Sequence, residues 1–348
     1  MGRSETLTER VSAYPSMLHY SDRLSAKRKK LDRDGFYVGM LKDDIRNQRY
    51  AYEVSLVAQG ADMEVASETL FALLNDFNDR GVDRDPTDPF FSFVDRLLEE
   101  SVDGKGMLLE LHLLPEEHNT AQQSRRRFQR AEVDDQQGTS MPSFGYLPRW
   151  SVLSSGRGDV LQVATAESAA PVSIPRGRIC QAEMRQANRS KWRKTIKELR
   201  QVDDVKMFGG ADRLGWKGYT FSEQVETQNL AVASTTAPVG WDARGTFGDS
   251  VTSPYMAFRR LRFASFWAET VEDTIAFLNQ FTSDKSLYGE SAFAFSLSGI
   301  PSPRDLAAAM QDLRAGLITV EDAHNTYLLP KYAKRVAQTA EPESKGTE

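Results

Sequence analysis

The sequence has almost none of the residues from which disulfides and thiolate metal clusters are built. Its 348 residues include one cysteine, Cys180, and four histidines. A single cysteine can form neither an internal disulfide nor a cluster of thiolate ligands, so we expect a reducing, cytoplasmic compartment. We expect no cofactor and no metal ion, and no residue is assigned a catalytic role.

Long apolar runs are also absent. No run approaches the roughly 20 residues that a helix needs to cross a bilayer, and the first residues lack the apolar core of a signal peptide. We therefore expect no contact with a membrane. Hydrophobic residues make up 40% of the chain and charged residues 27%, as is typical of soluble globular proteins. The net charge of -5 argues against a surface that is basic all over, but it is compatible with a local basic patch.

The first part of the chain is polar and basic. Residues 1–42 include four consecutive basic residues at 27–30, which indicate a solvated arm or a contact for nucleic acid or a partner. Helical patterns then begin. We expect one helix over 43–60, a second that ends before Gly81, and a third that begins at Asp88.

A small β-rich region follows these helices, and together they form a predicted section over 43–250. The apolar run 107–114 lies between glycine and proline and predicts a buried strand. Residues 115–141 are hydrophilic and predict a mobile loop. Strand patterns resume over 144–174 with connections too short for helical crossovers, which indicates an antiparallel sheet. Residues 208–248 are rich in glycine, and we expect them to be irregular.

The longest predicted element is a helix over 253–281. Pro254 fits its first turn, and neither glycine nor proline follows for more than seven turns. At 1.5 Å per residue, such a helix is about 40 Å long. Two shorter helices are predicted to open at Ser302 and Thr319, each of which has an aspartate three residues later.

Together these segments predict an α+β fold. It has a helical N-terminal region, a small antiparallel sheet and a C-terminal helical region with one long helix. The C-terminal region is predicted to cover 251–333, and the polar residues 334–348 to form a disordered tail.

The first candidate binding surface is a basic helix, predicted over 190–201. Cations surround an aromatic ring there, and cations with a stacking surface are the mixture that nucleic-acid grooves use. A helix that pairs with an acidic neighbour shows the same pattern, so both interpretations are kept. The candidate nucleic-acid-binding residues are Lys191, Trp192, Arg193, Lys194, Lys197 and Arg200.

The second candidate surface is a group of arginines, Arg259, Arg260 and Arg262, near the start of the long helix. A helix N-terminus is the positive end of the macrodipole and disfavours cations. We therefore expect acidic groups of a neighbouring subunit, or DNA phosphates, to offset these charges. Aromatic residues on several faces of the helix favour self-association. Simple burial within the domain is the alternative.

Enzyme motifs are scarce. His112 and His118 bracket Glu116 and Glu117, and these four side chains are the only candidate metal ligands. Their spacing matches no helical or hairpin ligand pattern, and His112 lies within an apolar strand. A metal-dependent hydrolase is therefore the third hypothesis, and we do not expect an enzyme.

Several segments resemble those of bacteriophage portal proteins. Residues 89–114 are similar to the helix, glycine turn and strand at the start of the β-rich wing, and 253–279 to a long helix opened by Ser-Pro. Residues 313–323 resemble a helix entry near the portal C-terminus. Residues 174–179 are similar to the return that precedes the portal stem.

The resemblance implies a structural protein without enzymatic activity. Such a protein forms a ring of identical subunits, contacts double-stranded DNA through its phosphates, and docks a packaging motor or other assembly proteins of a phage or prophage. Its localisation would be the virion. The alternative function is a cytosolic nucleic-acid-binding or adaptor protein.

Overall fold

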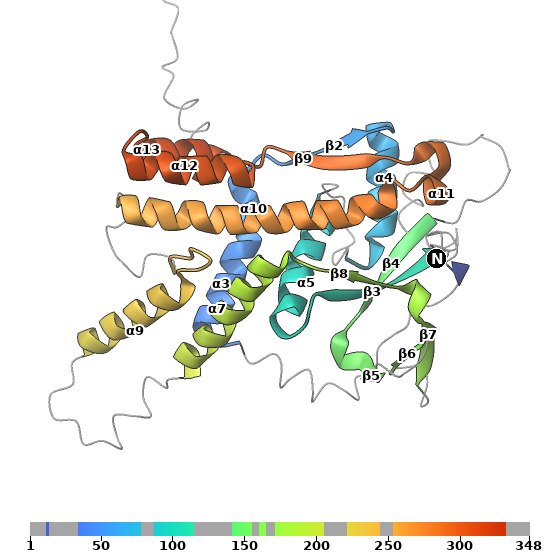
Figure 1. Cartoon of the computed structure of the whole chain (residues 1–348), viewed down its shortest axis with the longest axis horizontal. Coiled ribbons are helices and arrows are strands. Elements are labelled where there is room, and N and C mark those ends of the chain that lie inside the picture. The colour runs from blue at the N-terminus through green and yellow to red at the C-terminus, as the bar shows by residue number, and fades with distance from the viewer. Residues whose placement is uncertain are drawn as a thin grey trace, which may run out of the picture. The chain divides into compact units, whose positions relative to one another are not determined.

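The computed structural model describes most of the chain, namely residues 12–13, 34–77, 87–114, 141–154, 160–164, 171–204, 221–243 and 253–331. The fold is α+β, as predicted, with helices and small, mainly antiparallel sheets (Figure 1). None of the described helices is long and apolar enough to span a membrane.

The chain divides into two compact units, each built from three separate segments. Unit 1 contains 1–33, 55–184 and 273–297, and unit 2 contains 34–54, 185–272 and 298–348. The section boundaries expected near residues 42 and 250 do not coincide with the boundaries of these units.

Unit 1 is built around strand β3 (Met107–Leu114). This strand pairs antiparallel with β4 (Met141–Leu147) on one side and with β8 (Ile179–Ala182) on the other. The short β1 (Ser12–Ala13) pairs with β3 in parallel. A separate antiparallel sheet has the order β5-β6-β7 and comprises Val152–Ser154, Val160–Val163 and Val172–Pro175.

Helices and short turns complete unit 1. The helices are α4 (Met63–Leu73), α5 (Asp88–Asp103) and α11 (Lys285–Tyr288). In its described residues, 3₁₀ turns lie at Asn75–Phe77 (η3), Arg149–Ser151 (η5), Arg176–Arg178 (η6) and Gly289–Ser291 (η8). A two-stranded sheet pairs β2 (Ser55–Gln59) with β9 (Ala294–Ser298).

The core of unit 1 is aromatic. The ring of Phe277 stacks on that of Phe93 with 6.1 Å between centroids, and the ring of Phe281 meets that of Phe144 edge-on at 4.9 Å. These contacts bring α5, β4 and the end of the long helix α10 (Pro254–Thr282) together. Aromatic pairs in such geometries stabilise a fold by more than the burial of their apolar area alone.

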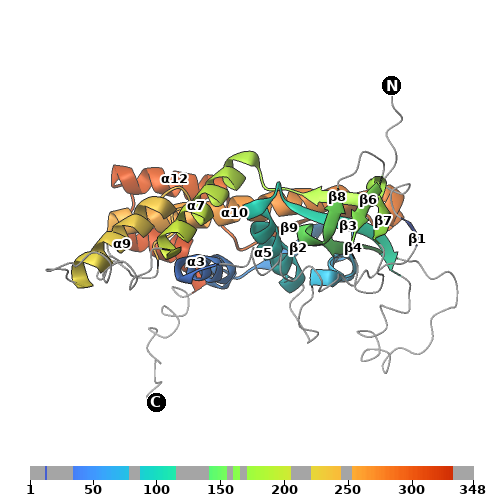
Figure 2. The same ribbon diagram turned by 90° about the horizontal axis from the view of Figure 1, so that it is seen from below.

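Unit 2 is helical. Helix α7 (Gln186–Asp204) lies against α3 (Phe36–Asn47) and α9 (Phe221–Thr236) (Figure 2). The first part of α10 contacts α7, where the rings of Trp192 and Phe266 stack with 5.7 Å between centroids. The remaining elements of unit 2 are η2 (Gln48–Ala51), α12 (Pro303–Ala315), α13 (Val320–Ala323) and the π-helical turn η9 (His324–Leu328).

The start of α3 was not predicted. The residue before the helix is Gly35, which has no side chain that could accept from the free amides of the first turn. Asp203 of α7 does so instead, and accepts hydrogen bonds from the backbone amides of Tyr37 (2.9 Å) and Val38 (3.2 Å). The prediction of a helix over 43–60 is therefore wrong, because α3 begins at Phe36 and residues 55–59 form a strand.

Most other predicted elements are confirmed. They include the strands β3 to β7, the basic helix, the long helix and the two C-terminal helices with side-chain caps at Ser302 and Thr319. The expectation of irregular structure over 208–248 is wrong for 221–236, which form α9. The predicted loop over 115–141 lies outside the described residues except for Met141, which begins β4. The tail and most of the N-terminal arm also lie outside them.

Candidate functional site

Helix α7 separates its residues onto two faces. Trp192, Ile196 and Leu199 are fully buried, and their spacing of four and three residues places them on one side of a helix. Lys191, Lys194 and Lys197 are exposed and follow one another at intervals of three. Residues three apart are neighbours on a helix surface. We call these three side chains the lysine row.

The lysine row is accessible and nearly free of internal partners. Lys194 approaches Glu198 at 3.8 Å, and both side chains are exposed, so this ion pair is weak. Lys191 and Lys197 make no ion pair with any residue that the structure describes. The ammonium groups are therefore available to an external anion.

Trp192 does not belong to this accessible surface. Its ring has no exposed area and stacks on Phe266 of α10. The prediction that it offers a stacking surface to bases is wrong, because the ring fills the core between α7 and α10.

The other two predicted cations of α7 differ from the lysine row. The guanidinium of Arg200 donates to Asp34 from Nε (3.2 Å) and Nη2 (3.0 Å), which ties α7 to the residues before α3. Arg193 is half-buried. Arg200 is thus a structural residue, and a role for it in phosphate contact would require this ion pair to break.

The arginines at the start of α10 have partners within unit 2. Arg259 is 3% exposed, and its guanidinium donates to the carbonyl of Ala233 (2.8 Å), the hydroxyl of Thr236 (2.7 Å) and the carbonyl of Trp241. Arg262 donates to the carbonyl of Ala237 at 3.0 Å. Most of these acceptors lie at the C-terminal end of α9, the negative end of its macrodipole.

Arg260 pairs with a carboxylate of the same unit. Its Nε donates to Asp242 at 2.5 Å. The expectation that a neighbouring subunit or DNA must offset Arg259, Arg260 and Arg262 is therefore wrong, because α9 and the turn after it supply the acceptors. The sequence contained no cap or apolar periodicity that identified α9.

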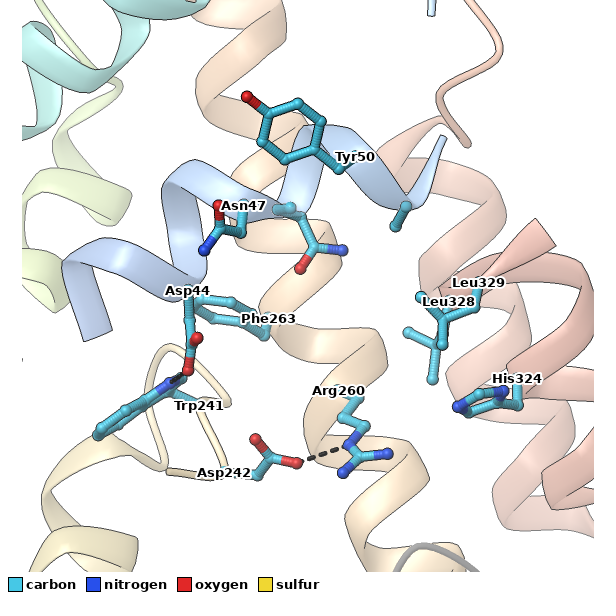
Figure 3. Close-up of a pocket in the computed structure, with 12 residues that line it drawn as sticks. Asp44, Asn47, Tyr50, Trp241, Asp242, Arg260, Phe263, His324, Leu328 and Leu329 are labelled. Carbon is cyan, nitrogen blue, oxygen red and sulfur yellow. Dashed lines mark hydrogen bonds and ion pairs between the residues drawn. The ribbon is translucent and has the colours of Figure 1, made fainter. Parts of the chain in front are cut away.

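A pocket of about 440 Å³ lies beside Arg260 in unit 2 (Figure 3). Helix α10 contributes Arg260 and Phe263 to it, and η9 contributes His324 and Leu328. The rest of the lining comes from α3, η2 and the segments after α9 and η9: Asp44, Asn47, Gln48, Tyr50, Ala51, Trp241, Asp242 and Leu329.

Both carboxylates of the pocket accept a hydrogen bond from a neighbouring side chain. Asp44 accepts a hydrogen bond from the indole Nε1 of Trp241 at 2.7 Å, and Asp242 accepts from Arg260. Partial burial lowers the pKa of His324, and the nearby charge of Arg260 lowers it further. His324 is therefore a neutral imidazole at pH 7, with one N–H donor and one acceptor nitrogen. Sequence reasoning gave His324 no role.

Of the four candidate metal ligands, the structure describes only His112. His112 is buried in β3, and burial is the main cause that lowers its pKa, while the nearby carboxylate of Asp76 opposes this shift. Glu116, Glu117 and His118 lie outside the described residues. In the described ranges, no three side chains of His, Cys, Asp or Glu are grouped so that they could hold a metal ion.

Unit 1 contains a largely buried ion pair that the sequence did not indicate. Arg178 of η6 approaches the buried carboxylate of Glu110 on β3 at 2.5 Å. The pair joins the turn before β8 to the strand on which β8 pairs, so it supports the register of this sheet.

Comparison of the chain with protein-family models, with curated proteins and with solved structures found no match.

Proposed function

We propose that the protein is an oligomeric structural subunit, similar to phage portal proteins, that contacts DNA through its phosphates. The observation that carries this proposal is the lysine row of α7. Its three exposed ammonium groups project from a helix whose opposite face is fixed in the core. Contact with phosphates needs only such cations and no reading of base edges.

The geometry of the row favours contact with the DNA backbone. From Lys191 to Lys197 it extends about 9 Å along the helix, at 1.5 Å per residue. Duplex DNA carries one negative charge per about 1.7 Å of its axis, so the row can face several phosphates at once. Because the ring of Trp192 is buried, α7 offers no aromatic platform for unpaired bases.

The test replaces Lys191, Lys194 and Lys197 together by glutamine and measures binding to duplex DNA of random sequence by fluorescence anisotropy. The plot of log K against log salt loses about 0.9 in slope for each phosphate contact removed, so we expect a loss of about 2.7. The affinity of the triple variant for duplex DNA at low salt should also be lower than that of the wild type.

A matched control removes three exposed cations elsewhere, Lys105, Lys285 and Arg304, and should leave the slope nearly unchanged. A triple variant of the lysine row that binds with the wild-type slope would show that α7 is not the contact. Strong preference for one base sequence would contradict recognition through phosphates alone.

A further inference from the structure

We propose that the pocket of unit 2 binds a small organic carboxylate with an apolar body. No step of this inference depends on the proposed contact with DNA. It rests on the donors that the pocket leaves unused, on the shape of its charged end and on its apolar wall (Figure 3).

Arg260 is the anchor of the site. Only its Nε is engaged, by Asp242 at 2.5 Å, and within the described part of the chain no residue accepts from its two Nη groups. The guanidinium fork matches a carboxylate with two parallel hydrogen bonds. The bond to Asp242 holds the Arg260 side chain in place, and its exposed fraction of 28% leaves it reachable by a ligand.

Two further polar groups of the pocket are unused. Neither the imidazole of His324 nor the amide of Asn47 hydrogen-bonds to another described residue. Figure 3 shows His324 on the same side of the pocket as Arg260, and Asn47 on the side of α3. A carboxylate that binds Arg260 can therefore accept a further hydrogen bond from the N–H group of the neutral imidazole of His324.

The acidic residues of the pocket already have donors. Asp44 accepts from Trp241 at 2.7 Å, and Asp242 accepts from Arg260. The lining therefore holds two carboxylates against one guanidinium, and an anion can bind only at the end of the pocket where the two Nη groups of Arg260 lie. A carboxylate carries only one charge and suits this balance better than a multiply charged phosphate.

Apolar side chains form the remaining wall. Phe263 is 7% exposed and Leu328 is 6% exposed, so both are fixed in the core of unit 2, and Leu329 continues this surface outward. Pockets for small molecules combine such walls with a few polar groups, in volumes of roughly 300 to 1,000 Å³. The volume of about 440 Å³ lies in this range.

The experiment titrates the full chain with benzoate and follows the indole N–H signal of Trp241 by NMR. The protein contains five tryptophans, and the spectrum of a Trp241→Phe variant assigns this signal. We expect a saturable shift with benzoate. Neutral benzamide, cationic benzylamine and inorganic phosphate should each bind about tenfold more weakly or worse, because each lacks either the planar anion or the apolar body.

Two variants test the donors. Arg260→Lys keeps the charge but removes the fork, and should weaken benzoate binding about tenfold. Arg304→Lys, an exposed arginine of the same unit, should bind as the wild type does. If Arg260→Lys fails to fold, His324→Phe serves instead, because it keeps the ring and loses the donor, with about tenfold weaker binding expected.

The proposal is overturned by any of three results. The first is the absence of a saturable shift with benzoate at millimolar concentration. The second is a benzamide or benzylamine affinity equal to that of benzoate. The third is unchanged benzoate affinity in the folded variants of Arg260 and His324.

Discussion

Arg259 is a buried cation that neutral groups hold in place. Its guanidinium meets two backbone carbonyls and one hydroxyl around the C-terminal end of α9 and the turn after it. A buried charge costs free energy unless it is paired or hydrogen-bonded. The negative end of the α9 macrodipole therefore supplies what a carboxylate would supply elsewhere.

Replacement of Arg259 by methionine should lower the free energy of unfolding by about 3 kcal/mol, because buried carbonyls of Ala233 and Trp241 lose their charged donor. Methionine keeps most of the side-chain volume, so the loss reports on hydrogen bonds more than on packing. Urea titration followed by circular dichroism measures the effect.

The control for this change is Arg304→Met on the exposed surface of α12, for which we expect a change below about 0.5 kcal/mol. Equal stabilities of the two variants would mean that the hydrogen bonds of Arg259 contribute nothing to the free energy of unfolding.

At the level of single residues, the sequence identified the unusual arginines but not their partners. The macrodipole argument correctly marked Arg259, Arg260 and Arg262 as needing compensation. It assigned this compensation to another molecule because α9 was not predicted. Burial of Trp192 was predictable, since Trp192, Ile196 and Leu199 repeat at the spacing of an apolar helix face.

Among the elements, the junction of α3 and α7 depends on two aspartates. Asp203 caps α3, and Asp34 binds both Lys42 of α3 and Arg200 of α7. Burial of the Asp34 carboxyl raises its pKa, but the hydrogen bonds and charges of Lys42 and Arg200 outweigh this effect. The pKa therefore lies below its ordinary value of 3.8.

This shift predicts a loss of stability in acid. Because the folded state lowers the pKa of Asp34, the stabilisation is fully present above the unfolded value near 3.8 and is lost as pH falls through the folded value. Asp34→Asn should lower the free energy of unfolding by about 1 kcal/mol at pH 7. The difference from wild type should shrink between pH 4 and pH 2, as urea titrations over this range would show.

Asp312→Asn is the comparison for the acid experiment, since Asp312 makes no ion pair in the described ranges of the chain. Its difference from wild type should stay small at every pH. A difference between Asp34→Asn and wild type that is constant with pH would refute the role given to the Asp34 carboxylate.

Elements with local start signals were predicted well, and elements with remote partners were not. Helices α5, α12 and α13 each show a proline or a capping residue at the start, and the structure follows these signals. The cap of α3 comes from a residue 166 positions away. Strands β2 and β9 are short, and more than two hundred residues separate them in the sequence. Their pairing therefore involves no hairpin turn that the sequence could indicate.

The division of the whole molecule could not be derived from continuous sequence sections. Each unit is assembled from three segments, and α10 passes from unit 2 to unit 1 after Glu272. The amino-acid composition does not change at Glu272, because the boundary between the two units falls within one uninterrupted helix. Long-range contacts, which leave no local pattern, decide which segments belong together.

For the whole molecule, the proposed function predicts the mass of the assembly in solution. Size-exclusion chromatography with light scattering should show a ring of many copies, because a portal-like subunit acts only in a closed assembly. A strict monomer at micromolar concentration would contradict the portal-like function. If that monomer still bound DNA through the lysine row, a cytosolic nucleic-acid-binding or adaptor protein would be the better interpretation.

The cap supplied by Asp203 has a consequence for biosynthesis. A ribosome adds roughly 5 to 20 residues per second. The first turn of α3 is therefore translated about 8 to 33 s before the carboxylate that completes it, given the 166 positions between them. Until then the nascent segment has only solvent or a chaperone for its free amides.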